Sequence, residues 1–260
     1  MSEETRLALL SWSEVAELDR GRTVAVLPTA AVEQHGPHLP LDTDTYLCTR
    51  VVEAAADRAQ HGGPVLVAPT LAFGSSAHHM AFAGTLTLAA ETFLAVVGDL
   101  CGNLVQHGFR RLLVVNGHGG NSALVRAAVQ QLANRAPVLA VAIDYWDLAR
   151  DITPDVRESP PGGMAHACEF ETSLMLHLRP ESVRQELVRR EIPEPRFASE
   201  RIDLISSAAV TAGWRTDELS SSGVLGAPDL ATPEKGERLF EACVEGLSQL
   251  IGELRGAPLR

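Results

Sequence analysis

Residues 23–44 read TVAVLPTAAVEQHGPHLPLDTD, an apolar run that ends in a group of acidic and imidazole side chains. The run is short, nearly continuous and rich in β-branched residues, which is typical of a strand covered on both faces. Glu33 and His35 follow it at positions i and i+2, so both point to the same side if the chain stays extended. The next Gly-Pro pair turns the chain, which brings Asp42 or Asp44 back towards them.

Strand and helix patterns alternate along the rest of the chain. Further apolar runs occupy residues 64–71, 112–115 and 137–143, and helical patterns occupy residues 45–59, 89–107 and 122–136. This alternation predicts an α/β fold with a mostly parallel central sheet. The length fits one large domain or two small ones, and since nothing in the composition forces a split we expect a single domain over residues 1–260.

The two ends of the chain carry helix-start signals. Ser11 with Glu14 predicts a capping box for a short first helix, and Thr232 followed by Pro233 predicts the start of a long last one. Between residues 193 and 228 the patterns give way to Pro, Ser, Gly and mixed charge. So long an irregular stretch is more often a lid, a binding loop or a subunit contact than a linker.

Composition excludes several classes of protein. The chain has 260 residues, 45% of them hydrophobic, and a mean hydropathy of +0.04, which describes a globular chain with a sizeable core. Its 22 Lys and Arg residues against 33 Asp and Glu residues give a net charge of −11, which opposes nucleic-acid binding. No apolar stretch reaches the roughly 20 residues that cross a bilayer, and the acidic start does not resemble a secretory signal. We therefore expect a cytoplasmic protein that binds neither nucleic acid nor membrane, with its scattered cysteines reduced.

Polar segments gather where the predicted strands end. They are EQHGPHLPLDTD (33–44), GSSAHH (74–79) and NGHGGN (116–121), to which HACEFET (166–172) adds a fourth before an apolar run. Because the carboxyl ends of parallel strands lie at one edge of a sheet, we expect these segments to share one rim. At most one of His78 and His79 should face it, since neighbours in an extended segment point opposite ways.

Glu, His and Asp without Cys are ligands suited to Zn, Mn or Fe. The segments supply more of them than the three that one catalytic zinc usually takes, and a bridging carboxylate holding two ions would use the surplus. Such a centre activates water and polarises a carbonyl group. Each segment alone has a plainer interpretation, and NGHGGN is equally well explained as a tight turn. A structural metal site is another alternative, but structural sites favour Cys ligands.

The same segments, in this order, resemble the creatininase family of metal-dependent amidohydrolases. The resemblance implies a three-layer α/β/α sandwich, two divalent metal ions and a homo-oligomer, which in this family is often a ring, such as a hexamer. It assigns Glu33, Asp44 and His118 to one ion, and His35 with the bridging Asp44 to the other. It also makes His166 the catalytic histidine, and it places Ser76 at the substrate and Asp42 outside the metal shell.

The chain departs from the family pattern after the histidine of NGHGGN. Members that hydrolyse creatinine have an aromatic residue and a Glu there, where this chain has Gly119 and Gly120. Glu171 is our candidate for the missing ligand, with Glu169 as second choice, and the alternative role for Glu171 is to orient His166. The missing aromatic argues against creatinine as substrate. The NGHGGN form resembles the branch that contains the mycofactocin precursor peptidase and the formamidopyrimidine-nucleotide deformylase, and the motifs PLDTDT, AHAxxxETS and GVLG lean towards the peptidase.

These observations predict hydrolysis of a C–N amide bond in a cyclic amide, a formamide or a short peptide. His166 would pass a proton to the leaving nitrogen, for which an ordinary pKa near 6.5 is suitable. Candidates for substrate binding are Ser76, His79, Gly119, Gly120 and Trp146, with the segments 151–163 and 193–222. The alternatives are a nucleotide- or phosphate-binding α/β protein, in which the glycines at a helix start hold an anion, and an inactive metal-bound scaffold.

Overall fold

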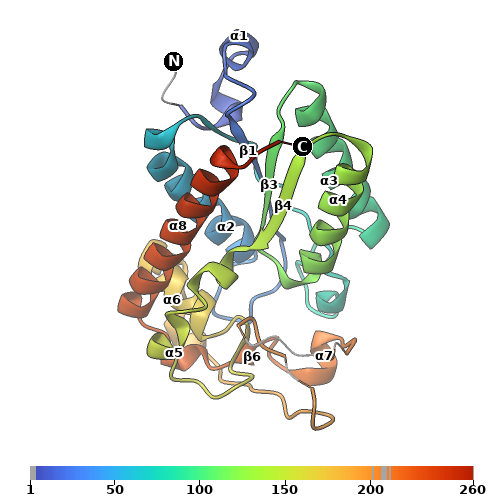
Figure 1. Ribbon diagram of the computed structural model, residues 1–260. Coiled ribbons are helices and arrows are strands. Elements are labelled where there is room, and N and C mark those ends of the chain that lie inside the picture. The colour runs from blue at the N-terminus through green and yellow to red at the C-terminus, as the bar shows by residue number, and fades with distance from the viewer. Residues whose placement is uncertain (1–3, 201, 206–209, 211, 260) are drawn as a thin grey trace.

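The computed structural model describes residues 4–200, 202–205, 210 and 212–259. Its main sheet contains β1 (Val24–Thr29), β2 (Val65–Val67), β3 (Arg111–Asn116) and β4 (Leu139–Asp144), all parallel, in the order β2-β1-β3-β4. Helices cover both faces of this sheet (Figure 1). The predicted α/β sandwich with a parallel sheet is confirmed.

Side chains of each central strand alternate between two cores. In β1, Val24 and Val26 pack into one core, whereas Ala25 and Leu27 pack into the other, and all four are buried. This alternation is the period-2 geometry of a strand. It explains why the runs are continuously apolar, since neither face meets water.

The helices divide between the two faces (Figure 1). One core is closed by α2 (Thr43–Ala59), α6 (Glu169–Leu178) and α8 (Pro233–Gly256). The other is closed by α3 (Ala90–Gln106) and α4 (Ser122–Arg135), and Val15 of α1 (Trp12–Ala16) packs against it. None of the helices among the described residues is long and apolar enough to span a membrane.

Both predicted helix starts are confirmed. Ser11 and Glu14 form the capping box at the start of α1, with each side chain accepting a hydrogen bond from the other residue's backbone N–H. The Thr232 side chain accepts from the backbone N–H of Lys235 at the start of α8. Each cap satisfies N–H groups that a helix start leaves without partners.

Smaller elements lie at the carboxyl ends of the strands, at the bottom of Figure 1. They are α5 (Thr153–Val156), α7 (Thr216–Leu219) and an antiparallel pair formed by β5 (Met164–His166) and β6 (Leu225–Gly226). The sequence did not predict this pair, because runs of two or three residues carry no readable periodicity.

The second strand is shorter than predicted. The apolar run at residues 64–71 forms a strand only over Val65–Val67, after which Leu71 makes an isolated bridge to Thr29. Pro69 lies between them and has no N–H group to donate to a neighbouring strand.

Candidate metal centre

Side chains from five segments converge at the carboxyl ends of the strands. They are Glu33 and His35 after β1, Asp44 in the first turn of α2, His118 after β3, His166 in β5 and Glu171 in the first turn of α6. All are less than a tenth exposed. The rim expected from the sequence therefore brings together residues up to 138 positions apart, counted from Glu33 to Glu171.

Asp44 connects two groups of potential ligands. Its Oδ2 lies 3.1 Å from Nδ1 of His118, which is 3.3 Å from Oε1 of Glu33. Its other oxygen, Oδ1, lies 3.0 Å from Nε2 of His35, which is 3.7 Å from Oε1 of Glu171. Each oxygen of one carboxylate thus faces its own triad: Glu33, Asp44 and His118, or His35, Asp44 and Glu171.

Both histidines of these triads are held by backbone carbonyl groups. Nδ1 of His35 lies 3.2 Å from the carbonyl oxygen of Glu33, and Nε2 of His118 lies 3.1 Å from that of Ser75. A carbonyl oxygen only accepts, so these ring nitrogens carry the hydrogen. The opposite nitrogen of each ring faces the carboxylates, and this is the usual arrangement of a metal-binding histidine.

Three carboxylate oxygens of the centre have no hydrogen bond with the described residues. Among the described residues, both Oε atoms of Glu33 and Oδ2 of Asp44 are buried without a hydrogen bond. The nearby ring nitrogens are close but not aligned with them for a hydrogen bond, as expected when both groups point at a common third position. Buried carboxylates in this state are costly unless a cation compensates them.

The pKa shifts of His35 and His118 show that the surrounding carboxylates stabilise positive charge at this position. Burial disfavours a charged His35, but Asp44 and Glu171 outweigh it and raise the pKa of His35 well above its ordinary value. Glu33 and Asp44 likewise overcome burial at His118 and raise its pKa to about 10. Without metal, protons on these rings supply the charge, and a divalent cation replaces protons at such sites.

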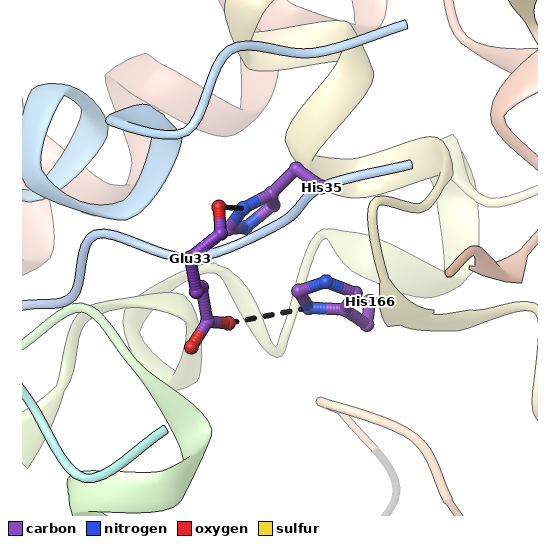
Figure 2. Close-up of side chains that lie close together, drawn as sticks. All are labelled: Glu33, His35 and His166. Atoms are coloured by element: carbon purple, nitrogen blue, oxygen red, sulfur yellow. Dashed lines mark hydrogen bonds and ion pairs between the residues drawn. The ribbon is translucent and has the colours of Figure 1, made fainter. Parts of the chain in front are cut away.

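His166 has a different environment (Figure 2). Its Nε2 lies 2.7 Å from the backbone carbonyl oxygen of Gln34 and must donate to it, which leaves Nδ1 free at 3.6 Å from Oε1 of Glu33. Burial and the neighbouring His35 lower the pKa of His166 to about 3. The neutral ring is therefore favoured, and its pKa lies below the ordinary value near 6.5 that would suit a proton carrier.

Gln34 is a residue of the site to which the sequence assigned no role. Its side-chain nitrogen donates to the carbonyl oxygen of Gly223 at 3.0 Å and lies 2.8 Å from Nδ1 of His79. That contact leaves Nε2 of His79 as the nitrogen that faces Oε1 of Glu33, at 3.2 Å. Gln34 thus orients His79 through its side chain and His166 through its backbone.

The structure separates the two candidate glutamates of α6. Glu171 faces His35, whereas the carboxylate of Glu169 accepts from Lys235 at 2.5 Å and from the backbone N–H groups of Glu158 and Ser159. The position of the Glu169 carboxylate therefore favours Glu171 as the candidate ligand. His166 belongs to β5 and α6 begins only at Glu169, so His166 and Glu169 do not share a helical face.

A cavity of about 580 Å³ opens onto both triads. Gly119, Gly120 and Trp146 line it as expected, and both His78 and His79 line it. The expectation that at most one of this histidine pair faces the site was wrong, because residues 77–79 form a 3-10 helix and not an extended segment.

Other expectations about the cavity need correction. Ser76 is fully buried, its hydroxyl lies 3.3 Å from Nε2 of His118, and it is absent from the described lining of the cavity, so it contacts the histidine and does not face the cavity. The described lining includes no residue of the segment 151–163 either. The segment 193–222 does contribute, with Trp214 packing edge-on against His78 at 4.9 Å between ring centroids.

Asp42, expected outside the metal shell, pairs with Arg179 at 2.6 Å. Gly120 requires glycine for packing, since a Cβ there would lie 2.3 Å from the carbonyl oxygen of Ser75 and 2.5 Å from Nε2 of His118. This close approach explains a glycine of NGHGGN without a bound phosphate.

Known proteins are similar to this chain in sequence and in fold. The family model for creatininase, described as creatinine amidohydrolase, matches residues 8–251. A mycofactocin precursor peptide peptidase from Mycobacterium ulcerans (strain Agy99) is 36% identical over 239 residues, which cover 90% of this chain and 86% of the relative. Creatinine amidohydrolase from Pseudomonas putida is 30% identical over 269 residues, which cover 97% of this chain and 98% of that protein.

A solved structure of a creatininase variant of the Zn–Zn type has a TM-score of 0.80 to this chain at 29% identity, covering 97% of this chain and 98% of the other. The family model, the sequence relatives and the shared fold agree along nearly the whole length. The chain belongs to the creatininase family.

Proposed function

We propose that this protein hydrolyses a C–N amide bond with two divalent metal ions, Zn, Mn or Fe. The observation that carries the proposal is the position of Asp44, whose two oxygens face two separate triads of buried ligands. Glu33, Asp44 and His118 would hold one ion, and His35, Asp44 and Glu171 the other. Ions held there would supply an activated water and polarise the substrate carbonyl.

The protein's own groups complete the proposed reaction. Water adds to the amide carbon, the C–N bond breaks, and the leaving nitrogen must gain a proton. Nδ1 of His166 carries no hydrogen and lies beside Glu33, so it is placed to take the proton that the attacking water loses and to pass it to the leaving nitrogen. Glu171 acts as a ligand in this proposal, because it lies beside His35.

Two carboxylates of α6 give a matched test of the ligand assignment. Glu171→Gln should reduce the metal content from two ions per chain to one, because it removes a ligand of one triad. Glu169→Gln should keep both ions but lower the free energy of unfolding by about 1–3 kcal/mol, because it removes the charge that accepts from two backbone N–H groups and from Lys235, which keeps Glu158 as a second partner. Elemental mass spectrometry and urea denaturation measure the two effects. Metal loss in the Glu169 variant alone would reverse the assignment.

Substrates of two sizes are consistent with the family: the relatives include a peptide peptidase and a creatinine amidohydrolase. We propose a small amide or short peptide as substrate. The rival phosphate-binding function loses support because Gly120 is packed against Ser75 and His118. The homo-oligomer stays a prediction of the family resemblance, which light scattering on the purified protein tests.

Chelation tests the proposed function directly. The purified protein should hold about two ions per chain and hydrolyse some member of a panel of formamides, lactams and short peptides. A chelator should abolish hydrolysis, and Zn or Mn should restore it, because the water is activated only at the metals. A fully loaded protein that hydrolyses nothing in the panel would favour the inactive scaffold instead.

A further inference from the structure

The cavity extends from the two triads to a second group of charged side chains. We call this group the arginine subsite, formed by Ser122, Arg126, Asp144, Asp147 and Arg150. In the chain, Gly119 stands between the ligand His118 and the start of α4, and it lines the same cavity. A Cβ at Gly119 would meet no other atom within 4 Å, so this position leaves open space where a side chain would narrow the cavity.

Each arginine of the subsite is held by one aspartate and keeps unused donors. A terminal nitrogen of Arg126 lies 2.7 Å from Oδ2 of Asp144, and a terminal nitrogen of Arg150 lies 2.6 Å from Oδ1 of Asp147. A guanidinium group has five N–H donors, and each arginine uses only one nitrogen in hydrogen bonds with the described residues. The side chains are 63% and 46% exposed, so a ligand in the cavity can reach them.

Asp144 also fixes the subsite relative to the metal centre. Its Oδ1 accepts from the side chain of Asn116 at 2.6 Å and from Ser122 at 2.9 Å. The same Asn116 nitrogen donates to the backbone carbonyl of His118 at 2.7 Å. One amide group therefore connects the aspartate that holds Arg126 to the backbone of a metal-ligand candidate.

The charge of the subsite favours a singly charged ligand. Its two arginines balance its two aspartates, and the start of α4 adds partial positive charge. Two further acids of the cavity, Glu200 and Asp203, pair with Arg196 and Arg157 and so do not add free negative charge to it. A balanced site with spare guanidinium donors accommodates a carboxylate better than a dianionic phosphate.

We propose that the arginine subsite binds a free carboxylate of the substrate while the amide to be cleaved lies at the two triads. The substrate class is then an acylated amino acid or a short peptide cleaved near its carboxyl end. This proposal rests on the proposed amide hydrolysis for the reacting end, but the binding of the carboxylate can be measured without turnover.

The test compares two ligands that differ only in terminal charge, N-acetylglycylglycine and N-acetylglycylglycinamide. Calorimetry on the metal-loaded protein should show about tenfold tighter binding of the acid, as expected for charge-assisted hydrogen bonds. In the double variant Arg126→Gln, Arg150→Gln this ratio should fall to about twofold or less. Arg135→Gln, which removes an exposed arginine of the same helix outside the cavity, should keep the original ratio.

The outcomes separate this inference from the proposed function. An acid-to-amide ratio unchanged in the double variant, with its fold confirmed by circular dichroism, would overturn the subsite, even if the protein hydrolyses amides. A lowered ratio in a protein that hydrolyses neither ligand would support the subsite and count only against the function. Inorganic phosphate should compete no better than acetate, and much stronger competition by phosphate would overturn the carboxylate assignment.

Discussion

Asp44→Asn should remove both metal ions and lower kcat/KM by on the order of 10³-fold or more. The residue is the only member shared by the two triads of described ligands, with one carboxylate oxygen facing each. The Asn side chain has the same shape as that of Asp but offers only one, neutral oxygen, so neither ion keeps a complete set of charged ligands. Loss of the ions removes several kcal/mol of transition-state stabilisation, and each 1.36 kcal/mol is a factor of ten in rate.

Asp42→Asn is the matched control for this variant. It makes the same chemical change two positions away, but Asp42 is about half exposed and pairs with Arg179. Its metal content and activity should stay near those of the unchanged protein, and stability should change by at most about 1 kcal/mol, as is usual for surface ion pairs. Elemental mass spectrometry, steady-state kinetics and thermal unfolding compare the two variants.

Two results would count against a bridging role. If Asp44→Asn keeps one tightly bound ion and most of its activity, the triads work independently and the centre is effectively mononuclear. If it loses activity but keeps both ions, the carboxylate acts on substrate and not on metal. A metal-dependent rise in melting temperature, present in the Asp42 variant and absent in the Asp44 variant, shows that loss of metal and not misfolding is responsible.

The candidate ligands near strand ends could be predicted because their positions follow from local geometry. Glu33 and His35 follow β1 at alternating positions, and His118 follows β3, so the parallel sheet alone brings them to one edge. Asp144 occupies the equivalent position at the end of β4 and lines the cavity. The rule that polar residues at the carboxyl ends of parallel strands meet at one edge, applied to the fourth strand, would have predicted Asp144 as a residue of the site.

The choice between Glu169 and Glu171 could not be read from spacing. It depends on where α6 begins and on the turn before it, in which Ala167 has a φ of 49°, a left-handed conformation uncommon for residues other than glycine. This turn separates the strand that carries His166 from the helix that carries both glutamates. Tertiary contacts decide the outcome: Lys235 from α8 holds Glu169 away from the metal centre.

The cavity wall depends on contacts between distant segments. Trp214 lines the cavity and belongs to a stretch of sequence without regular periodicity. Two positions later, the hydroxyl of Thr216 donates to the carbonyl oxygen of His78 at 2.9 Å and so attaches this stretch to the cavity wall. Asp203 joins the same stretch to Arg157 at 2.6 Å. Such pairs are separated by 46 or more positions, so no local pattern in one sequence indicates them.

His166→Ala should lower kcat by about 10²–10⁴-fold for amides of alkylamines, the range typical for loss of a general acid. Metal content should be unchanged, since His166 belongs to neither triad that shares Asp44. His61→Ala, which changes an exposed histidine, should behave like the unchanged protein.

The leaving group distinguishes proton transfer from other roles of His166. An alkylamine cannot depart as an anion, so it needs the proton that the free Nδ1 is placed to pass. A p-nitroanilide departs with much less protonation, and its loss of kcat in the variant should be only about tenfold. Equal losses for both leaving groups, with one ion missing, would instead make His166 a ligand within the group Glu33, His35 and His166. Equal losses with both ions retained would mean that the ring positions Glu33 or the substrate, because only a proton donor makes the rate depend on the basicity of the departing nitrogen.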